Sequence, residues 1–241
     1  MGKRGSVMPS SNEKILSVMQ PTYLPWIGYF GLIKTSDIFV IYNTVQLTKR
    51  SWQVRNRIKT KDGDLYLTVP IKKTNKRDSL KIVDAEIDYT EDWQRKHLNS
   101  ISHSYKKSKY FDEVYHVVES CISKKYTSLS ELNSSFIINI CNLLGIQTEI
   151  HFSSDIDYSG KKSDALVSIC KYFNTTKYKS VKGSMDYILD DRKLFSDNNI
   201  ELIWHEYIHP VYEQQHGEFL SHMSILDCMF NVGINNTKEM I

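Results

Sequence analysis

The stretch ILSVMQPTYLPWIGYFGLIKTSDIFVIYN, residues 15–43, decides the fold that we predict for this chain. Its first five residues, 15–19, form an apolar run that predicts a short buried strand. The proline-rich loop that follows becomes helical around residues 27–34, and the β-branched and aromatic run at 37–43 predicts a second strand. Strand, loop, helix and strand within about thirty residues form a βαβ unit, which predicts a parallel pair of strands.

Beyond this unit, the second half of the chain alternates between strand and helix patterns. Strands are predicted at 148–152, 176–181 and 200–208, and helices at 162–173, 186–196 and 223–232. Such alternation is typical of a parallel sheet covered by helices. We therefore predict an α/β fold, with a single domain over residues 15–233 and a mainly parallel, Rossmann-like sheet.

Two features interrupt this alternation between residues 51 and 145. Segments 51–59 and 65–71 alternate in polarity around Asp62-Gly63, a strong turn signal, and predict a β-hairpin with one basic face. In segment 51–59, the alternation places Trp52, Val54, Asn56 and Ile58 on the apolar face and Gln53, Arg55, Arg57 and Lys59 on the basic face. A third strand around 80–87 is expected to join the hairpin. Three helical patterns then form a predicted insertion at about 91–145, in which Ser128 and Glu131 have the spacing of a capping box.

The composition is that of an ordinary globular protein, with 241 residues, of which 41% are hydrophobic and 24% charged. No apolar run approaches the length that a membrane-spanning helix needs. The four cysteines are far apart and include no C-x-x-C pair, which predicts buried free thiols in a reducing cytoplasm. We predict a disordered or vector-derived N-terminus at 1–14, which is polar, and a C-terminal tail at 234–241.

The positive charge of the chain is concentrated in one segment. Residues 49–77 carry ten Lys or Arg against two Asp, although the net charge of the whole chain is only +3. Arg50, Arg55 and Arg57 are candidates for clamping a pyrophosphate, because guanidinium forks match phosphate oxygens. The alternative is a solvated basic face. An RNA-binding surface is a further alternative, because Trp52 and Tyr66 are interleaved with the basic residues.

Residues 204–210, WHEYIHP, match the H-E-x-x-H pattern of zinc metalloproteases at His205, Glu206 and His209. A zinc site of that kind needs both imidazoles on one face of a helix. The surrounding residues favour a strand instead, and the proline after His209 disfavours helical backbone there. Residues four apart in a strand are roughly 13 Å from each other, too far for one ion to bridge. We therefore predict no metal site at this motif.

Three stretches together resemble the WbqC-like family, which is found among bacterial surface-polysaccharide genes. They are QPTYLPWIGYF (20–30), KRSWQVRNRIK (49–59) with LTVPIKK (67–73), and HPVYEQQHGEF (209–219) with SILDCMFNVG (224–233). The resemblance extends from about residue 15 to residue 233. One departure is Met19, which stands where the family usually has a histidine before Gln-Pro, so an essential role for that histidine does not carry over.

This resemblance indicates the biosynthetic context of the protein more than its reaction mechanism. WbqC-like proteins accompany enzymes of nucleotide-linked amino sugars, which often carry an acyl or aminoacyl group on nitrogen. The resemblance therefore implies amide formation on a sugar amine, in the cytoplasm, during O-antigen or other polysaccharide biosynthesis. A weaker likeness connects residues 20–41 with nucleotidylyltransferase-like proteins such as pantothenate synthetase. Their His-x-Gly-His motif is absent here, so only the architecture carries over.

Candidate substrate-binding residues follow the predicted strands, because ligands of open α/β sheets gather at the carboxyl ends of the strands. Loops after the first two strands supply Gln20, Thr22, Tyr23, Trp26, Asn43, Gln46, Lys49 and Arg50. The hairpin adds Trp52, Arg55, Asn56 and Arg57, all within the second family-like stretch. Two helix starts add Ser163 and Gly183 as possible anion contacts. For each group the alternative is a structural role: a rigid aromatic loop, a solvated face or a helix cap.

The candidate catalytic residues are His205, Glu206 and His209, with Tyr212 and Gln215 as nearby binding residues. A neutral histidine can take the proton from an attacking amine, and a carboxylate can orient that histidine. The alternative is a histidine hydrogen-bonded at a strand end. No G-x-S-x-G nucleophile elbow and no G-x-G-x-x-G dinucleotide motif is present.

The first predicted function is an N-acyl or aminoacyl transferase that acts on a nucleotide-linked amino sugar. Its acyl donor is open among coenzyme A, an acyl-carrier protein and an aminoacyl-tRNA. The alternative is a non-catalytic module that binds nucleotide sugar or tethers other polysaccharide enzymes, because the sequence has no strong nucleophile or metal signature. RNA binding is disfavoured, because the charge is confined to one hairpin.

Overall fold

A parallel five-stranded sheet forms the centre of the molecule in the computed structural model, which describes residues 14–48, 50–75, 79–181, 183, 188 and 191–241. The strands are β1 (Ile15–Met19), β2 (Ile38–Ile41), β5 (Glu149–Phe152), β6 (Lys177–Val181) and β7 (Glu201–His205). Their spatial order is β5-β2-β1-β6-β7, and all four neighbouring pairs are parallel. The α/β prediction and the parallel pair formed by β1 and β2 are confirmed.

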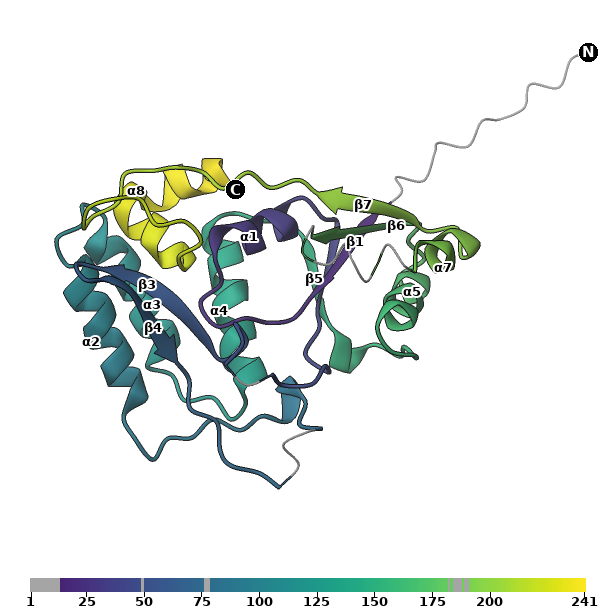
Figure 1. The fold of residues 1–241 in the computed structure, drawn as a ribbon, viewed down its shortest axis with the longest axis horizontal. Coiled ribbons are helices and arrows are strands. Elements are labelled where there is room, and N and C mark those ends of the chain that lie inside the picture. Colours follow the sequence, from purple (N-terminus) through teal and green to yellow (C-terminus); the bar gives the residue numbers. More distant parts are fainter. Residues whose placement is uncertain (1–13, 49, 76–78, 182, 184–187, 189–190) are drawn as a thin grey trace, which may run out of the picture.

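Helices cover both faces of this sheet (Figure 1). Helices α5 (Ser163–Tyr172) and α7 (Arg192–Asp197) lie on one face. Helices α1 (Ile27–Lys34), α4 (Leu129–Leu143) and α8 (Ile225–Met240) lie on the other. In β2, Ile38 and Val40 pack into the α5–α7 core, while Phe39 and Ile41 pack into the larger core on the other face. Burial on both faces explains why this strand has no polar alternation.

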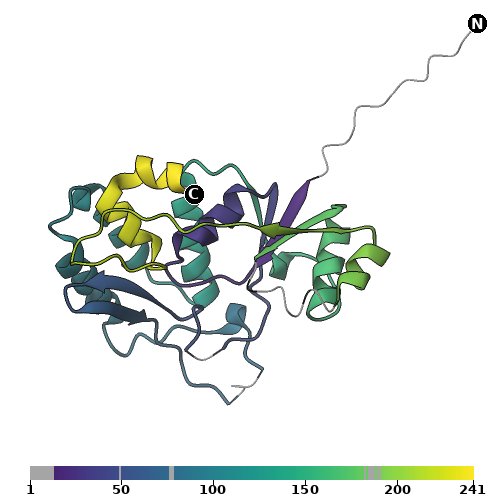
Figure 2. The same cartoon turned by 45° about the horizontal axis from the view of Figure 1, so that its top comes forward.

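The hairpin consists of β3 (Arg55–Thr60) and β4 (Gly63–Thr68), which pair antiparallel with Thr60 opposite Gly63. It packs with α2 (Trp93–Tyr105) and α3 (Phe111–Ile122) at the end of the molecule remote from α5 and α7 (Figure 2). Ser128 and Glu131 form the predicted capping box at the start of α4. No helix within the described residues has both the length and the apolar character that crossing a bilayer requires.

Several predicted elements differ from the structure. Residues 80–87 form no strand but a 3₁₀ turn, η1 (Ile82–Asp84), because residues 81, 86 and 87 each bridge to a different segment and build no ladder. A second 3₁₀ turn, η2 (Ser153–Asp155), directly follows β5. Strand β7 ends at His205 instead of residue 208, and residues 51–54 form turns. The predicted tail at 234–241 is helical to Met240, because α8 continues beyond a kink at Gly233 (φ 84°).

Four positions of the predicted helix at 186–196 (186, 187, 189 and 190) lie outside the described residues, and the end of the predicted range is helical as α7. Two predicted hairpin exposures are also wrong. Lys59 was expected on the solvated basic face, but it is 1% exposed because residues 214–218 cover it. Trp52 was expected on the apolar face, but it precedes the strand and is 49% exposed.

Candidate functional site

The carboxyl ends of β1, β2 and β6 open onto a cavity of about 710 Å³. The chain runs outward from β1 to β2 and β5, and then returns to the other side of β1 to form β6 and β7. The cavity therefore lies where the direction of the sheet reverses, the usual place for a ligand in an open α/β fold. Its walls include Met19, Gln20 and Thr22 after β1, Ser180 in β6, and Lys162 at the start of α5.

A smaller cavity of about 350 Å³ adjoins the first, and the two share Met19, Thr22 and Trp52. The smaller one is also lined by Trp26, Tyr29, Asn56 and His222. We call the two together the switch-point groove. It brings together Gln20, Thr22, Trp26, Trp52 and Asn56 from the predicted binding residues.

The loop after β1 is held rigidly by buried polar side chains. Asn56 Nδ2 donates to the carbonyl oxygens of Tyr23 (3.1 Å) and Leu24 (2.8 Å), and Asn133 Nδ2 donates to those of Pro21 and Gln53. The Tyr23 hydroxyl lies 2.9 Å from His97 Nδ1, and neither side chain is more than 6% exposed. Tyr23 and Asn56 therefore position the loop, and only Asn56 also reaches the groove.

Thr22 is the polar side chain of this loop that is left for a ligand. Its Oγ1 is buried and has no hydrogen-bond partner in the part of the chain that the structure describes. Gln20 Oε1, in contrast, accepts a 2.5 Å hydrogen bond from Gln53 Nε2. A buried hydroxyl without a partner costs about 1–3 kcal/mol, so a bound ligand that pairs with Thr22 would recover that energy.

The basic face of the hairpin is only partly available. Arg57 pairs with Asp64 at 2.9 Å and donates to the carbonyl oxygen of Ser221, while Lys59 Nζ donates to Gln214 Oε1 at 3.0 Å. Arg55 lies 4.5 Å above the ring of Tyr66, which stacks on Trp52 at 6.1 Å. Arg55 and Arg57 therefore do not form the expected clamp, because Arg57 is occupied by Asp64.

The three predicted catalytic residues have different surroundings. His205 is 9% exposed, faces Gly31 of α1, and its Nε2 has no partner among the described residues. Glu206 is exposed. Burial lowers the pKa of both His205 and His209, and the charge of Lys179 lowers that of His205 further.

The imidazole of His209 is held by hydrogen bonds within its own loop. Its Nδ1 is 2.8 Å from the carbonyl oxygen of Pro210, and its Nε2 accepts a hydrogen bond from the His222 backbone N–H at 3.0 Å. Its ring also stacks on Trp26, with centroids 6.0 Å apart. With both nitrogens engaged, His209 orients the groove wall and has no lone pair left to act as a base.

His222 is the imidazole that sequence reasoning missed. It is exposed, lines the smaller cavity, and lies 4.9 Å from Trp26 between ring centroids. Its Nδ1 contacts Ser221 Oγ at 2.9 Å, which leaves Nε2 without a hydrogen-bond partner among the described residues. Its φ of 59° is left-handed, a conformation that histidine adopts more often than most residues. No sequence motif marks it.

Tyr212 belongs to a buried network centred on Asp227, a residue that is fully buried. The hydroxyls of Tyr105 and Tyr212 donate to the two Asp227 oxygens at 2.8 and 2.9 Å, and Gln214 Nε2 donates at 2.6 Å. Burial raises the pKa of Asp227, although these donors oppose the shift. The network anchors the segment 209–223, which carries His209 and His222, to α8 and α2.

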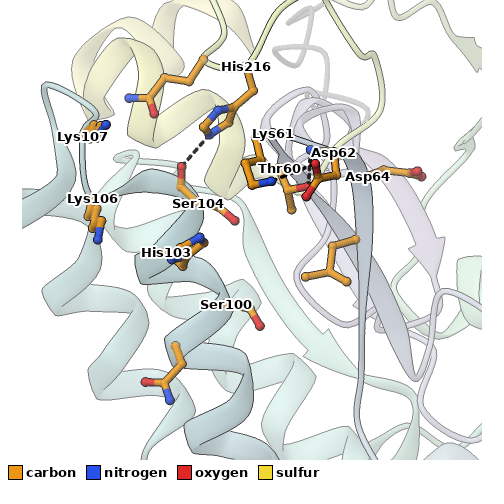
Figure 3. Close-up of a pocket in the computed structure, with 13 residues that line it drawn as sticks. Thr60, Lys61, Asp62, Asp64, Ser100, His103, Ser104, Lys106, Lys107 and His216 are labelled. Atoms are coloured by element: carbon orange, nitrogen blue, oxygen red, sulfur yellow. Dashed lines mark hydrogen bonds and ion pairs between the residues drawn. The ribbon is translucent and has the colours of Figure 1, made fainter.

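Gln215 lies in a different cavity, of about 850 Å³, between the hairpin tip and α2 (Figure 3). His103, Lys106 and Lys107 gather there at the C-terminal end of α2, and the His216 ring contacts the Ser104 carbonyl oxygen. Basic side chains at a helix C-terminus complement the helix dipole, which explains them without a ligand.

The remaining predicted binding residues that the structure describes do not line the groove. Asn43 is 3% exposed and bonds with Ser130, Ser153 and Ser154. The Gln46 carbonyl oxygen lies 3.4 Å from Gln53 Nε2, and Arg50 is exposed with a φ of 56°. Ser163 Oγ donates to Asp191 at 2.6 Å instead of capping α5. Gly183 is exposed, and Lys49 lies outside the described residues.

Metal-binding groups do not assemble in the described ranges, where no three His, Cys, Asp or Glu side chains are placed to hold one ion. Residues 201–205 form a strand and 206–210 are irregular, so the H-E-x-x-H motif is not helical.

Comparisons with known proteins give one family model and one relative. The model of the WbqC-like protein family matches residues 20–239. A protein of Mycobacterium tuberculosis (strain ATCC 25618 / H37Rv), "Uncharacterized protein Rv1507c", is 35% identical over 222 residues, which cover 91% of this chain and 94% of the relative. No solved structure matches the chain. The chain is a member of the WbqC-like protein family.

Proposed function

We propose that this protein forms an amide on the amine of a nucleotide-linked amino sugar, as an N-acyl or aminoacyl transferase of the cytoplasm. Its family membership is consistent with a role related to polysaccharide biosynthesis. The observation that carries the proposal is the switch-point groove, where an unpartnered Thr22 hydroxyl, two tryptophans and His222 border one ligand-sized space.

The two parts of the groove suit the two parts of such a substrate. The 710 Å³ cavity has the volume of a typical small-molecule site and extends to Lys162 at the start of α5, where the helix N-terminus and the positive charge of Lys162 favour phosphates. The exposed Trp52 borders both cavities and offers a face for a base or a sugar ring. The smaller cavity then holds the sugar amine near His222.

In the proposed reaction the sugar nitrogen attacks the acyl carbonyl carbon, and the bond from that carbon to the donor's sulfur or oxygen breaks. His222 Nε2 accepts the proton that the nitrogen loses, and the leaving thiolate or alkoxide is protonated to a thiol or hydroxyl. No covalent cysteine intermediate is needed, and burial raises the pKa of Cys141, Cys170 and Cys228 to about 12, which disfavours their thiolates.

The test of this function offers the protein dTDP- and UDP-linked amino sugars together with each donor class: acyl-coenzyme A, acyl-carrier protein and aminoacyl-tRNA. We expect one donor class to give a sugar nucleotide heavier by the acyl group, detected by mass spectrometry. If the sugar nucleotides bind and no donor gives an amide, the non-catalytic nucleotide-sugar module is the better description. If no sugar nucleotide binds either, both descriptions fail.

We also predict that Arg55 contributes to sugar-nucleotide affinity from the rim of the groove, where its guanidinium stacks on Tyr66 beside Trp52. Arg55→Lys keeps the charge and loses the planar fork, so it should weaken binding by about 1–3 kcal/mol, and Arg55→Ala by more. Calorimetric titration with a UDP-amino sugar measures the change. Arg95→Lys, in an exposed pair with Asp92, is the matched control. Unchanged affinity in both Arg55 variants would remove Arg55 from the site.

A further inference from the structure

Another cavity, of about 980 Å³, lies at the carboxyl ends of β2 and β5 and shares no lining residue with the switch-point groove. It is bounded by the first three turns of α4, by residues 124–127 before that helix, and by Phe152 and Ser154 after β5. The strand ends of an open parallel sheet are where ligands bind, and this cavity occupies the part of that edge that the groove leaves unused.

Uncharged hydrogen-bonding groups dominate the lining of this cavity. Seven hydroxyl side chains border it, namely Tyr126, Thr127, Ser128, Ser130, Ser134, Ser135 and Ser154. Asn43 and Asn139 add amides, and Phe152 and Ile138 add apolar surface. A hydroxyl has one donor and two acceptor sites, so those that bond once within the protein keep capacity for a ligand.

Ser134 is the side chain that most strongly indicates a ligand site. It is 3% exposed, it lines the cavity, and its Oγ has no hydrogen-bond partner within the described residues. Its neighbours are satisfied: Ser130 Oγ accepts from Asn43 at 3.2 Å, and Ser135 Oγ lies 2.9 Å from the Tyr126 hydroxyl. Buried hydroxyls in native proteins nearly always have a partner, so this exception requires an explanation.

The charges on the rim argue against a phosphate or another anion. The lining has no excess of positive charge, because it contains three carboxylates (Asp84, Glu86 and Glu131) and two amines (Lys124 and Lys125). Glu131 is moreover fixed by the capping box with Ser128. A ligand with many hydroxyls and an apolar C–H face matches such a surface better, because it exchanges hydrogen bonds with the serines and packs on Phe152.

We propose that this cavity is a carbohydrate-binding site separate from the switch-point groove, with Ser134 as a direct contact to a sugar hydroxyl. A neighbouring cavity of about 530 Å³ shares Glu86, Lys125, Tyr126 and Thr127 with it and continues to Tyr89. A cavity of about 980 Å³ has more volume than one sugar ring fills, so we infer that the site accommodates at least two linked units. This inference does not depend on acyl transfer.

The experiment uses the full chain with cellobiose and chitobiose as probes, beside the methyl glycosides of the corresponding monosaccharides. Saturation-transfer NMR should detect the disaccharides, with weaker signals from the monosaccharides. Ser134→Ala should weaken disaccharide binding about three- to tenfold, the scale of one hydrogen bond. Ser120→Ala, an exposed helical serine of α3 that bonds with its own helix, should leave binding unchanged.

Thermal melting separates a ligand contact from a structural role. Because the Ser134 hydroxyl has no partner to lose, Ser134→Ala should not lower the melting temperature, and removing the unsatisfied group can raise it slightly. Loss of sugar binding at an unchanged melting temperature supports the site. Absence of binding by both disaccharides, or equal binding by Ser134→Ala and the unaltered chain, overturns it. Neither outcome bears on amide formation, which is measured separately.

Discussion

Replacing Asp227 with alanine is expected to lower the free energy of unfolding by about 3–5 kcal/mol, because two buried hydroxyls and one half-buried amide lose this acceptor at once. Those donors are the hydroxyls of Tyr105 and Tyr212 and the amide of Gln214. Lys59 also loses a compensating negative charge, which matters because burial lowers the pKa of its amine. For a chain of this size the melting temperature should fall by about 10 °C, which calorimetry measures.

The control for this variant is Asp197→Ala. Asp197 pairs with Lys193 one helical turn away, and both side chains are more than half exposed. Exposed pairs of this kind contribute about 0.3–0.5 kcal/mol, so the melting temperature should hardly change. If Asp227→Ala melts like the control, the Asp227 network does not anchor the segment 209–223, and the position of His222 needs another explanation.

The Asp227 network also shows where prediction from sequence fails. Asp227 is predicted correctly within a helix, but nothing in the local pattern indicates that two tyrosines and a glutamine from distant segments converge on it. The predicted exposure of Lys59 is wrong for the same reason. Period-two alternation places it on the basic face of the hairpin, and the cover supplied by residues 214–218 is a long-range contact that no local pattern encodes.

The sheet itself was predictable because its signals are local. An apolar run, a proline-rich loop, a short helix and a β-branched run follow one another in residues 15–43, and the structure has β1, α1 and β2 there. The segment 80–87 has a similar apolar content but forms no strand, because its backbone is divided among three partners. The composition of a segment indicates that it can form a strand. It forms one only where a single continuous segment pairs with it along its length.

The location of the groove was predictable from the sequence, but only some of the residues that line it were. The rule that ligands gather at strand ends selects the loop after β1, and Thr22 and Trp26 do border the groove. The rule does not indicate which of these side chains are already hydrogen-bonded to other parts of the protein. Tyr23, Asn43 and His209 follow strands as expected, yet each is occupied by protein partners. His222 lies 17 residues beyond the end of β7 (205 to 222) and reaches the groove only because its loop folds back over Trp26.

His222→Gly is expected to reduce the rate of amide formation by about 10²–10⁴-fold, the usual contribution of a general base, while sugar-nucleotide affinity changes little. Glycine adopts the left-handed backbone of position 222 without strain, so the fold and the hydrogen bond from the backbone N–H to His209 should persist. Single-turnover kinetics with the active donor measure the rate. His209→Ala should instead lower the melting temperature, because it breaks both ring contacts that fix the loop.

Added imidazole separates a chemical role of His222 from a packing role. The glycine variant leaves an opening beside Trp26, at the mouth of the smaller cavity, and free imidazole can enter it and accept the amine proton in place of the missing ring. We expect millimolar imidazole to restore part of the rate in His222→Gly and to have no effect on the unaltered protein. A rate loss that imidazole does not restore, combined with weaker sugar-nucleotide binding, would mean that His222 shapes the cavity wall, and the base would then have to be sought elsewhere in the groove.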